Sequence, residues 1–160
     1  MTNPDLLTQL QQLSQMLEPY QFGVGGSCLL WQLGIESSPN DIDIVCCEAD
    51  FAAICTELVK SFSMLPVVPQ SDYATQHFAR FSKTGWPDIE LMAGIAVRRD
   101  GSIVQWPFQP ERCHWQQGVR WMPPADWLQL YQLFNRPQRV AQLRQYLVQL
   151  RLNGLSQHKD

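Results

Sequence analysis

The sequence has few charged side chains and no long apolar run. Charged residues make up 17% of its 160 residues, below the roughly 25% typical of soluble domains, whereas 19 residues are glutamines. The longest strongly apolar run, 91–97, is shorter than the roughly 18 residues that a membrane span needs. The N-terminus also lacks the basic and apolar segments of a signal peptide. We therefore expect a soluble, cytoplasmic protein.

Metal-binding and cofactor motifs based on cysteine or on three glycines are also absent. The five cysteines form no C-x-x-C pair, and no His stands at zinc-ligand spacing. We interpret them as reduced, mostly buried thiols. Gly23-x-Gly25 could begin a dinucleotide-binding fingerprint, but Cys28 stands where the third glycine would be. A zinc site, a disulfide framework and a dinucleotide fold are thus excluded.

The net charge of −3 excludes a generally basic nucleic-acid binder, but the charges are unevenly distributed. Residues 1–60 hold eight acids and one base, whereas residues 61–160 hold seven acids and eleven bases. This division suits carboxylates of one half that bind a metal beside an anion held by bases of the other half, although chance can also produce it.

Hydrophobic periodicity predicts one α+β domain over 1–160, in which helices flank a small mixed sheet. The core is expected at about 20–95 and a C-terminal helical part at about 124–153. Helices are predicted over about 3–18, 28–33, 50–62, 126–134 and 138–153, the first with Asn3 as N-cap and Pro4 in its first turn. Strands are predicted over 21–24, 41–46, 64–68, 76–82 and 88–92. The last two form a hairpin with its turn at 83–85, a second hairpin turn is predicted at 99–101, and 102–122 have no assignment.

The informative pair of segments is Gly25-Gly26-Ser27 and, 14 residues later, Asp41-Ile42-Asp43. Alternate side chains of a strand share a face, so Asp41 and Asp43 project together, and a hard cation such as Mg²⁺ would relieve their repulsion. The Gly-Gly-Ser turn opens a helix, where free backbone N–H groups and the Ser27 hydroxyl, expected at the N-cap, suit an anion. Together these segments can bring phosphate and metal into one site.

Gly23-Val24-Gly25-Gly26-Ser27 followed by Asn40-Asp41-Ile42-Asp43-Ile44 resembles the signature of the polymerase beta-like nucleotidyltransferase superfamily. The chain looks most like its small stand-alone members, of the minimal and antibiotic-modifying types. The family carries a third carboxylate on a neighbouring strand, usually Asp. The segment 88–94 offers Glu90, in the register of small relatives, with Asp88 as the alternative.

The resemblance implies a two-metal mechanism that transfers a nucleoside monophosphate from ATP or another NTP to an acceptor hydroxyl and releases pyrophosphate. It implies two Mg²⁺ ions held by the catalytic residues Asp41, Asp43 and Glu90. It also implies that Gly25, Gly26 and Ser27 bind the phosphates. The acceptor is left open among a small molecule, a protein and an RNA end, and so is homodimer formation; no membrane partner is expected.

Each motif also has a purely structural interpretation. A Gly-Gly-Ser turn or an Asp-x-Asp strand alone is often structural. Arg80 could bind phosphate or form a surface ion pair. His77 and His114 are weak candidates for a base, and the tryptophans of 106–127 are more often core or interface than stacking platforms. The alternative function is a binding module of the same fold that has lost turnover, which the Glu at position 90 favours.

Overall fold

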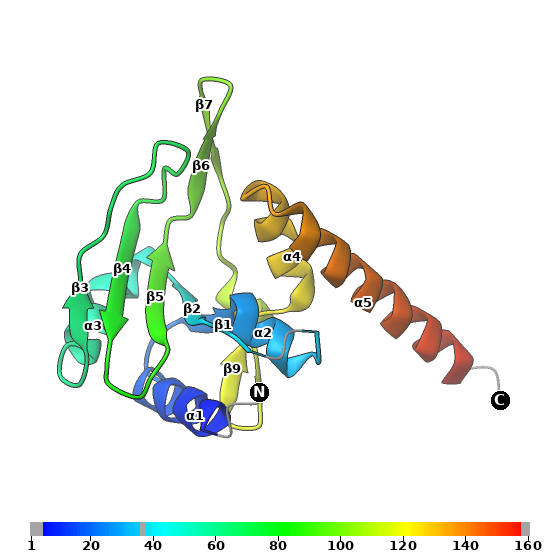
Figure 1. Cartoon of the computed structure of the whole chain (residues 1–160), viewed down its shortest axis with the longest axis horizontal. Helices are drawn as coiled ribbons and strands as arrows, with labels where there is room; N and C mark the ends of the chain where they lie inside the picture. Colours follow the sequence, from blue (N-terminus) through cyan, green and yellow to red (C-terminus); the bar gives the residue numbers. More distant parts are fainter. Residues whose placement is uncertain (1–4, 36–37, 158–160) are drawn as a thin grey trace. The chain divides into compact units, whose positions relative to one another are not determined.

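A computed structural model describes residues 5–35 and 38–157 of the chain (Figure 1). The chain divides into two compact units, Met1–Pro123 and Pro124–Asp160. The unit boundary coincides with the predicted start of the helical part, while the prediction that 1–160 forms one domain stays a prediction. Asn3 and Pro4, and the loop residues 36–37, lie outside the described residues.

The first unit is built on a seven-stranded mixed sheet and a separate two-stranded ribbon. Its strands are β1 Phe22–Gly25, β2 Asp41–Cys46, β3 Ser63–Leu65, β4 His77–Ser82, β5 Asp88–Ala93, β6 Ala96–Arg99, β7 Ser102–Gln105, β8 His114–Gln116 and β9 Val119–Trp121. The large sheet has the order β3-β4-β5-β2-β1-β9-β8, and β6 pairs with β7. Strands β2 and β5 run parallel, as do β1 and β9, and the other pairs are antiparallel. The predicted α+β class is confirmed.

Three α-helices pack against the large sheet. They are α1 Leu6–Met16, α2 Gly26–Gln32 and α3 Glu48–Leu58, and a short 3-10 helix, η1, spans Pro110–Arg112. Leu6, Leu10 and Leu13 of α1 are fully buried, as their spacing of three and four predicts. Helix α1 contacts β9, α2 contacts β1 and β2, and α3 contacts β4 and β5.

Strands β2 and β5 repeat the same alternation of buried and partly exposed side chains. Ile42 and Ile44 of β2, and Ile89 and Leu91 of β5, are fully buried. The acids between them are partly exposed. Because the strands are in register, their apolar side chains enter the core together and their acids share the opposite face. Burial of the aliphatic side chains therefore fixes where the carboxylates lie.

Two tight turns form hairpins in and next to 102–122, the segment that has no assignment from the sequence. Asp100 and Gly101 have φ of 52° and 76°, as a two-residue hairpin turn requires, and they join β6 to β7 as predicted. Gln117 and Gly118 have φ of 53° and 75° and join β8 to β9. The hairpin of β8 and β9 lies outside the predicted core of 20–95. It nevertheless belongs to the core, because β9 places the fully buried Trp121 beside Val24 of β1.

The second unit is a pair of helices, α4 Pro124–Leu133 and α5 Pro137–Gln157. The predicted break at 135–137 is confirmed, because Asn135 has φ of 56° and the N–H of Arg136 closes onto the carbonyl of Tyr131. The predicted helix end at Asn153-Gly154 is wrong, since α5 continues to residue 157. Gly inside a helix costs only about 1 kcal/mol, which weakens a helix without ending it.

None of the helices in the described residues has both the length and the apolar character that a membrane-spanning segment needs. The five cysteines are free. Cys28 and Cys46 are buried, whereas the other three are partly exposed, so the expected burial holds for two of them.

Candidate functional site

Four residues from four neighbouring strands lie opposite one another in a row across the large sheet. Gly25 of β1 is the register partner of Asp43 of β2, and Asp43 is the partner of Glu90 of β5. Glu90 is also the partner of Arg80 of β4. Directly opposite residues of adjacent strands point to the same face. The sheet therefore joins the glycine turn, the paired acids, the third acid and one arginine in a single site.

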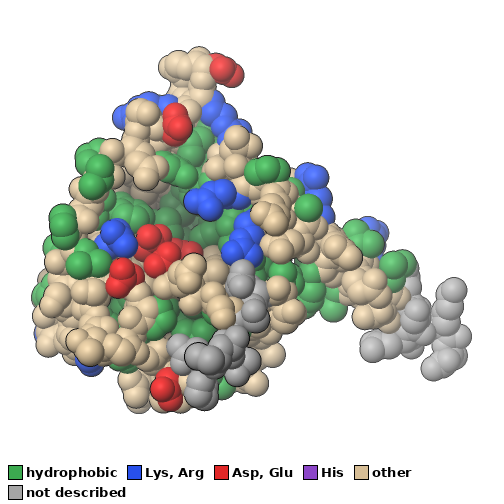
Figure 2. Space-filling model, viewed as in Figure 1, with side chains coloured by type: hydrophobic (Ala, Val, Ile, Leu, Met, Phe, Trp, Pro, Cys, Tyr) green, Lys and Arg blue, Asp and Glu red, His purple; other side chains and the backbone are tan. Residues whose placement is uncertain are grey.

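The next row adds a second pair of carboxylates to the same face. Asp41 is the register partner of Asp88, so Asp41, Asp43, Asp88 and Glu90 form a cluster that we call the acid cluster. The side chains of Asp88 and Glu90 are 37% and 27% exposed, so solvent and ligands can reach them. Figure 2 shows Asp and Glu side chains gathered on one face beside a basic side chain. The sequence predicted the face, and the structure shows that Glu90 rather than Asp88 shares the row of Asp43.

Gly26, the first residue of α2, has a left-handed backbone conformation and lies very close to Asp43. Other residues tolerate neither. The φ of Gly26 is 61°, in the left-handed region that favours glycine. A Cβ at this position would overlap Oδ2 of Asp43 and would lie 2.7 Å from Cγ of the same side chain. The bare backbone of the turn is therefore packed directly against the Asp43 carboxylate.

Ser27 has a different local role from the one predicted. The N-cap of α2 is Gly25, so the prediction that Ser27 stands at the N-cap is wrong. The Ser27 hydroxyl lies 3.3 Å from the backbone carbonyl oxygen of Asp41 and donates to it, and Cys28 Sγ lies 3.4 Å from that oxygen. These contacts fasten the first turn of α2 to the start of β2. The hydroxyl thereby holds the glycine turn beside the acid cluster.

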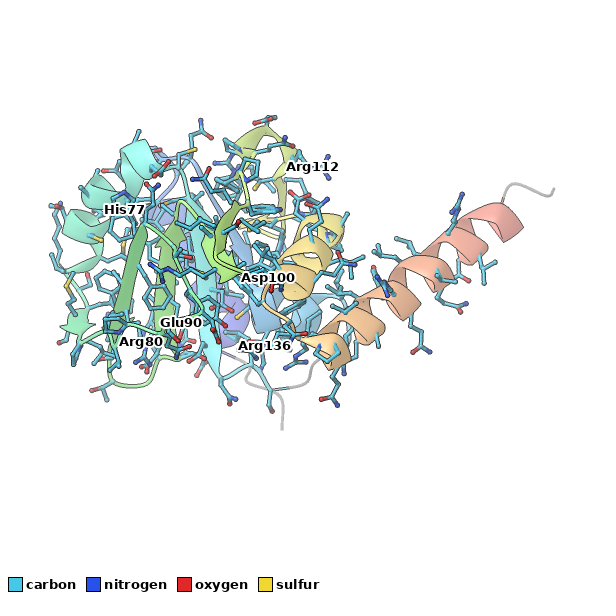
Figure 3. All side chains as sticks on the ribbon, turned by 90° about the horizontal axis from the view of Figure 1, so that it is seen from above. His77, Arg80, Glu90, Asp100, Arg112 and Arg136 are labelled. Atoms are coloured by element: carbon cyan, nitrogen blue, oxygen red, sulfur yellow. The ribbon has the colours of Figure 1, made fainter. Side chains whose placement is uncertain are left out.

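Arg80 projects from β4 toward the acid cluster, as Figure 3 shows for Arg80 and Glu90. One terminal nitrogen, Nη2, lies 3.4 Å from Oδ2 of Asp88, and Nε lies 3.7 Å from Oε1 of Glu90. The side chain is 34% exposed, yet its Nε is buried and has no hydrogen-bond partner. Sequence reasoning left open whether Arg80 meets phosphate or an ion pair, and here it faces two carboxylates.

The pKa of Asp41 is raised by its position in the acid cluster. Burial raises the pKa of the Asp41 carboxyl above its ordinary value of 3.8, and the charges of Glu90 and Asp88 raise it further. Arg80 acts in the opposite direction and lowers the pKa of Asp41. Burial and the nearby Asp43 and Asp41 carboxylates also raise the pKa of the Cys28 thiol, which stays neutral and is no nucleophile. Arg80 thus offsets only part of the rise in the pKa of Asp41 that burial and the other carboxylates cause.

The donor set of the acid cluster suits a hard divalent cation. Carboxylate oxygens are the ligands that Mg²⁺ prefers. The backbone of Gly26 lies against one of these carboxylates, that of Asp43. Among the described residues, no group of three or more His, Cys, Asp or Glu side chains is arranged so that it could hold a metal ion.

The two candidate histidines, His77 and His114, lie away from this row in the first unit. His77 stacks on Phe51 with ring centroids 5.0 Å apart and lies 3.9 Å from Glu48, at the other end of β4. His114 is exposed in β8, the edge strand beyond β9. Trp121 is fully buried, and Trp127 packs edge-on against Tyr131 in the second unit. The structure therefore gives neither His77 nor His114 a place in the acid cluster.

Comparison with known proteins places the fold. No family model and no curated protein matches the chain. Among solved structures, the crystal structure of a "putative nucleotidyltransferase" from Thermotoga maritima superposes with a TM-score of 0.68. It is 20% identical, and the match covers 93% of this chain and 96% of that chain. The chain therefore has a nucleotidyltransferase-like fold, while the more specific small stand-alone type stays a prediction.

Replacing Gly26 by alanine should destabilise the protein more than the same change at another left-handed glycine. Gly85 has φ of 83°, and a Cβ there would have nothing within 4 Å. Gly85→Ala should cost about 1–2 kcal/mol of unfolding free energy from backbone strain alone. Gly26→Ala should cost clearly more, because the new methyl group must displace Asp43. Urea denaturation of both variants measures the difference, and equal losses would show that Gly26 and Asp43 are not in contact.

The raised pKa of Asp41 predicts a pH-dependent stability. Because the folded pKa lies above the unfolded one, the folded state binds more protons in the window above 3.8. Stability therefore falls as the pH rises through that window. Asp41→Asn should raise the Tm of the EDTA-treated protein at neutral pH, and the gain should shrink as the pH falls through this window.

The exposed Asp72 supplies the control for this measurement, since it lies outside the acid cluster. Asp72→Asn removes the same charge and should leave the Tm nearly unchanged at either pH. A loss of Tm in Asp41→Asn at neutral pH would contradict a carboxylate held under repulsion.

Proposed function

We propose that this protein is a Mg²⁺-dependent nucleotidyltransferase that uses ATP or another NTP. The observation that carries the proposal is the row across the sheet, in which the glycine turn, Asp43 and Glu90 are neighbours in register. A phosphate-binding turn next to paired carboxylates and a third acid is the set of groups that nucleotidyl transfer needs. The nucleotidyltransferase-like fold supports the same conclusion.

Each residue of the row has a proposed role. Asp41 and Asp43 would hold the metal ion that accompanies the triphosphate, and together with Glu90 they would hold a second ion. When bound, these ions supply positive charge to the phosphates and lower the pKa of the acceptor hydroxyl. The backbone N–H groups of residues 25–27 would position the outer phosphates, since this turn lies directly against the Asp43 carboxylate.

The proposed reaction is a single displacement at the α-phosphorus. The oxygen of the acceptor hydroxyl forms a bond to that phosphorus, the bond to the bridging oxygen breaks, and pyrophosphate leaves. The hydroxyl proton passes to a carboxylate of the site, and Glu90 is the candidate because it adjoins Asp43 and is partly exposed. The acceptor is a small molecule, a protein or an RNA end.

The runner-up is a nucleotide-binding module of the same fold without turnover. One observation favours it, namely that Oε1 of Glu90 faces Nε of Arg80 at 3.7 Å. The resemblance adds that the nucleotidyltransferase family usually has Asp at the position of Glu90. In this alternative the site binds nucleotide and metal, but the third carboxylate never completes the catalytic arrangement. Turnover separates the two proposals.

Asp43→Asn should abolish metal-dependent transfer while the protein stays folded, because the amide keeps the shape of the side chain and loses its charge. The measurement incubates wild type and variant with Mg²⁺ and each labelled NTP, alone and with cell extract, and follows labelled product and pyrophosphate.

In wild type, Mg²⁺-NTP at one hundred times its Kd should stabilise the fold by about 2.7 kcal/mol. An unchanged Tm with all four NTPs would contradict the proposal.

The matched pair Glu90→Gln and Asp88→Asn tests the choice of third acid in the same assay. Glu90→Gln should lose transfer but keep nucleotide affinity, since the two aspartates remain. Asp88→Asn should change transfer little. Loss of transfer in Asp88→Asn alone would reverse the assignment, whereas nucleotide binding without transfer in wild type, gained by Glu90→Asp, would establish the binding module.

A further inference from the structure

Arg80 is a cation of this chain that already lies at the carboxylates which a metal would use. Its guanidinium faces Asp88 through Nη2 and Glu90 through Nε. Arg80 therefore compensates part of the charge of the acid cluster when no other cation is present.

The contacts of Arg80 are loose for a guanidinium and a carboxylate. Charge-assisted hydrogen bonds between nitrogen and oxygen are about 2.7–2.9 Å long, whereas the two distances here are 3.4 and 3.7 Å. The buried Nε makes no hydrogen bond at all, which costs free energy that a better partner would recover. Attraction between charges and one long hydrogen bond, which Nη2 donates to Oδ2 of Asp88 at 3.4 Å, hold the guanidinium near the acids.

A divalent cation at the cluster would compete with this arrangement. Glu90 cannot keep its guanidinium partner at full strength and also act as a ligand of a doubly charged ion. The partly exposed side chain of Arg80 has solvent on one side into which it can move.

We propose that Arg80 is an exchangeable counter-ion of the acid cluster, which a divalent cation displaces and which then binds the anionic phosphate of the nucleotide. This proposal rests on the proposed function, because it requires a metal at Asp41, Asp43 and Glu90. Arg80 would thereby couple the binding of the metal ion to the binding of the phosphate. Metal binding frees a guanidinium for phosphate, and by thermodynamic reciprocity phosphate binding to Arg80 strengthens metal binding.

The test measures metal binding without nucleotide and without turnover. Mn²⁺ alone is titrated into wild type, Arg80→Met, Arg80→Lys and Lys83→Met, and free Mn²⁺ is followed by electron paramagnetic resonance. Removing a positive charge a few ångströms from the cation should tighten Mn²⁺ binding about three- to tenfold in Arg80→Met. Arg80→Lys keeps the charge and should stay near wild type. Lys83→Met removes the same charge from the exposed turn after β4 and should change affinity less than twofold.

A second measurement shows whether the guanidinium moves. In protein labelled with ¹⁵N-arginine, the Nε signal that disappears in Arg80→Lys belongs to Arg80. Titration with Mg²⁺ alone should shift this signal and speed its exchange with water. Mn²⁺ binding of equal strength in wild type and Arg80→Met, or an Arg80 signal unchanged at Mg²⁺ saturation, would overturn the counter-ion proposal and leave the metal site intact. Failure of Mn²⁺ to bind any of the four proteins would overturn both proposals.

Discussion

Repulsion between carboxylates on two neighbouring parallel strands is the constraint on which the rest of the site depends. The core fixes the acids in place, because Ile42, Ile44 and Leu91 cannot be buried without turning the intervening acids to the other face. Burial raises the pKa of Asp41 above its ordinary value, and the charges of Glu90 and Asp88 raise it further. Arg80 relieves part of the repulsion, and a bound cation would relieve more. This repulsion is the physical reason for proposing that a cation binds here.

The local parts of the site could be predicted from the sequence, since they depend on short-range rules. The alternation of Asp41 and Asp43 with Ile42 fixes a strand face, and two consecutive glycines before a hydrophobic run indicate a turn into a helix. Both features involve residues within a few positions of one another. The face of β2 and the start of α2 therefore agree with expectation, apart from the N-cap, where the glycine conformation at 25–26 moved the helix start ahead of Ser27.

The long-range parts could not be predicted from periodicity alone, because it gives faces but not register. The pairing of Asp43 with Glu90 joins residues 47 positions apart and is decided by the packing of β2 against β5. The same holds for Arg80, whose partner acids follow from the hairpin of β4 and β5. Strand β9 was missed because three residues are too few to show a period, although Gly118 was a turn signal. The contact of Gly26 with Asp43 also required coordinates.

The central claim is that the glycine turn and the acid cluster form one site for a metal-bound triphosphate. A crystal structure with Mn²⁺ and a non-hydrolysable ATP analogue tests it most directly, since anomalous scattering locates the manganese. The account predicts manganese coordinated by the carboxylates of Asp41 and Asp43, with the outer phosphates against the backbone of Gly26 and Ser27. Manganese bound elsewhere, or a triphosphate that leaves this turn untouched, would contradict it.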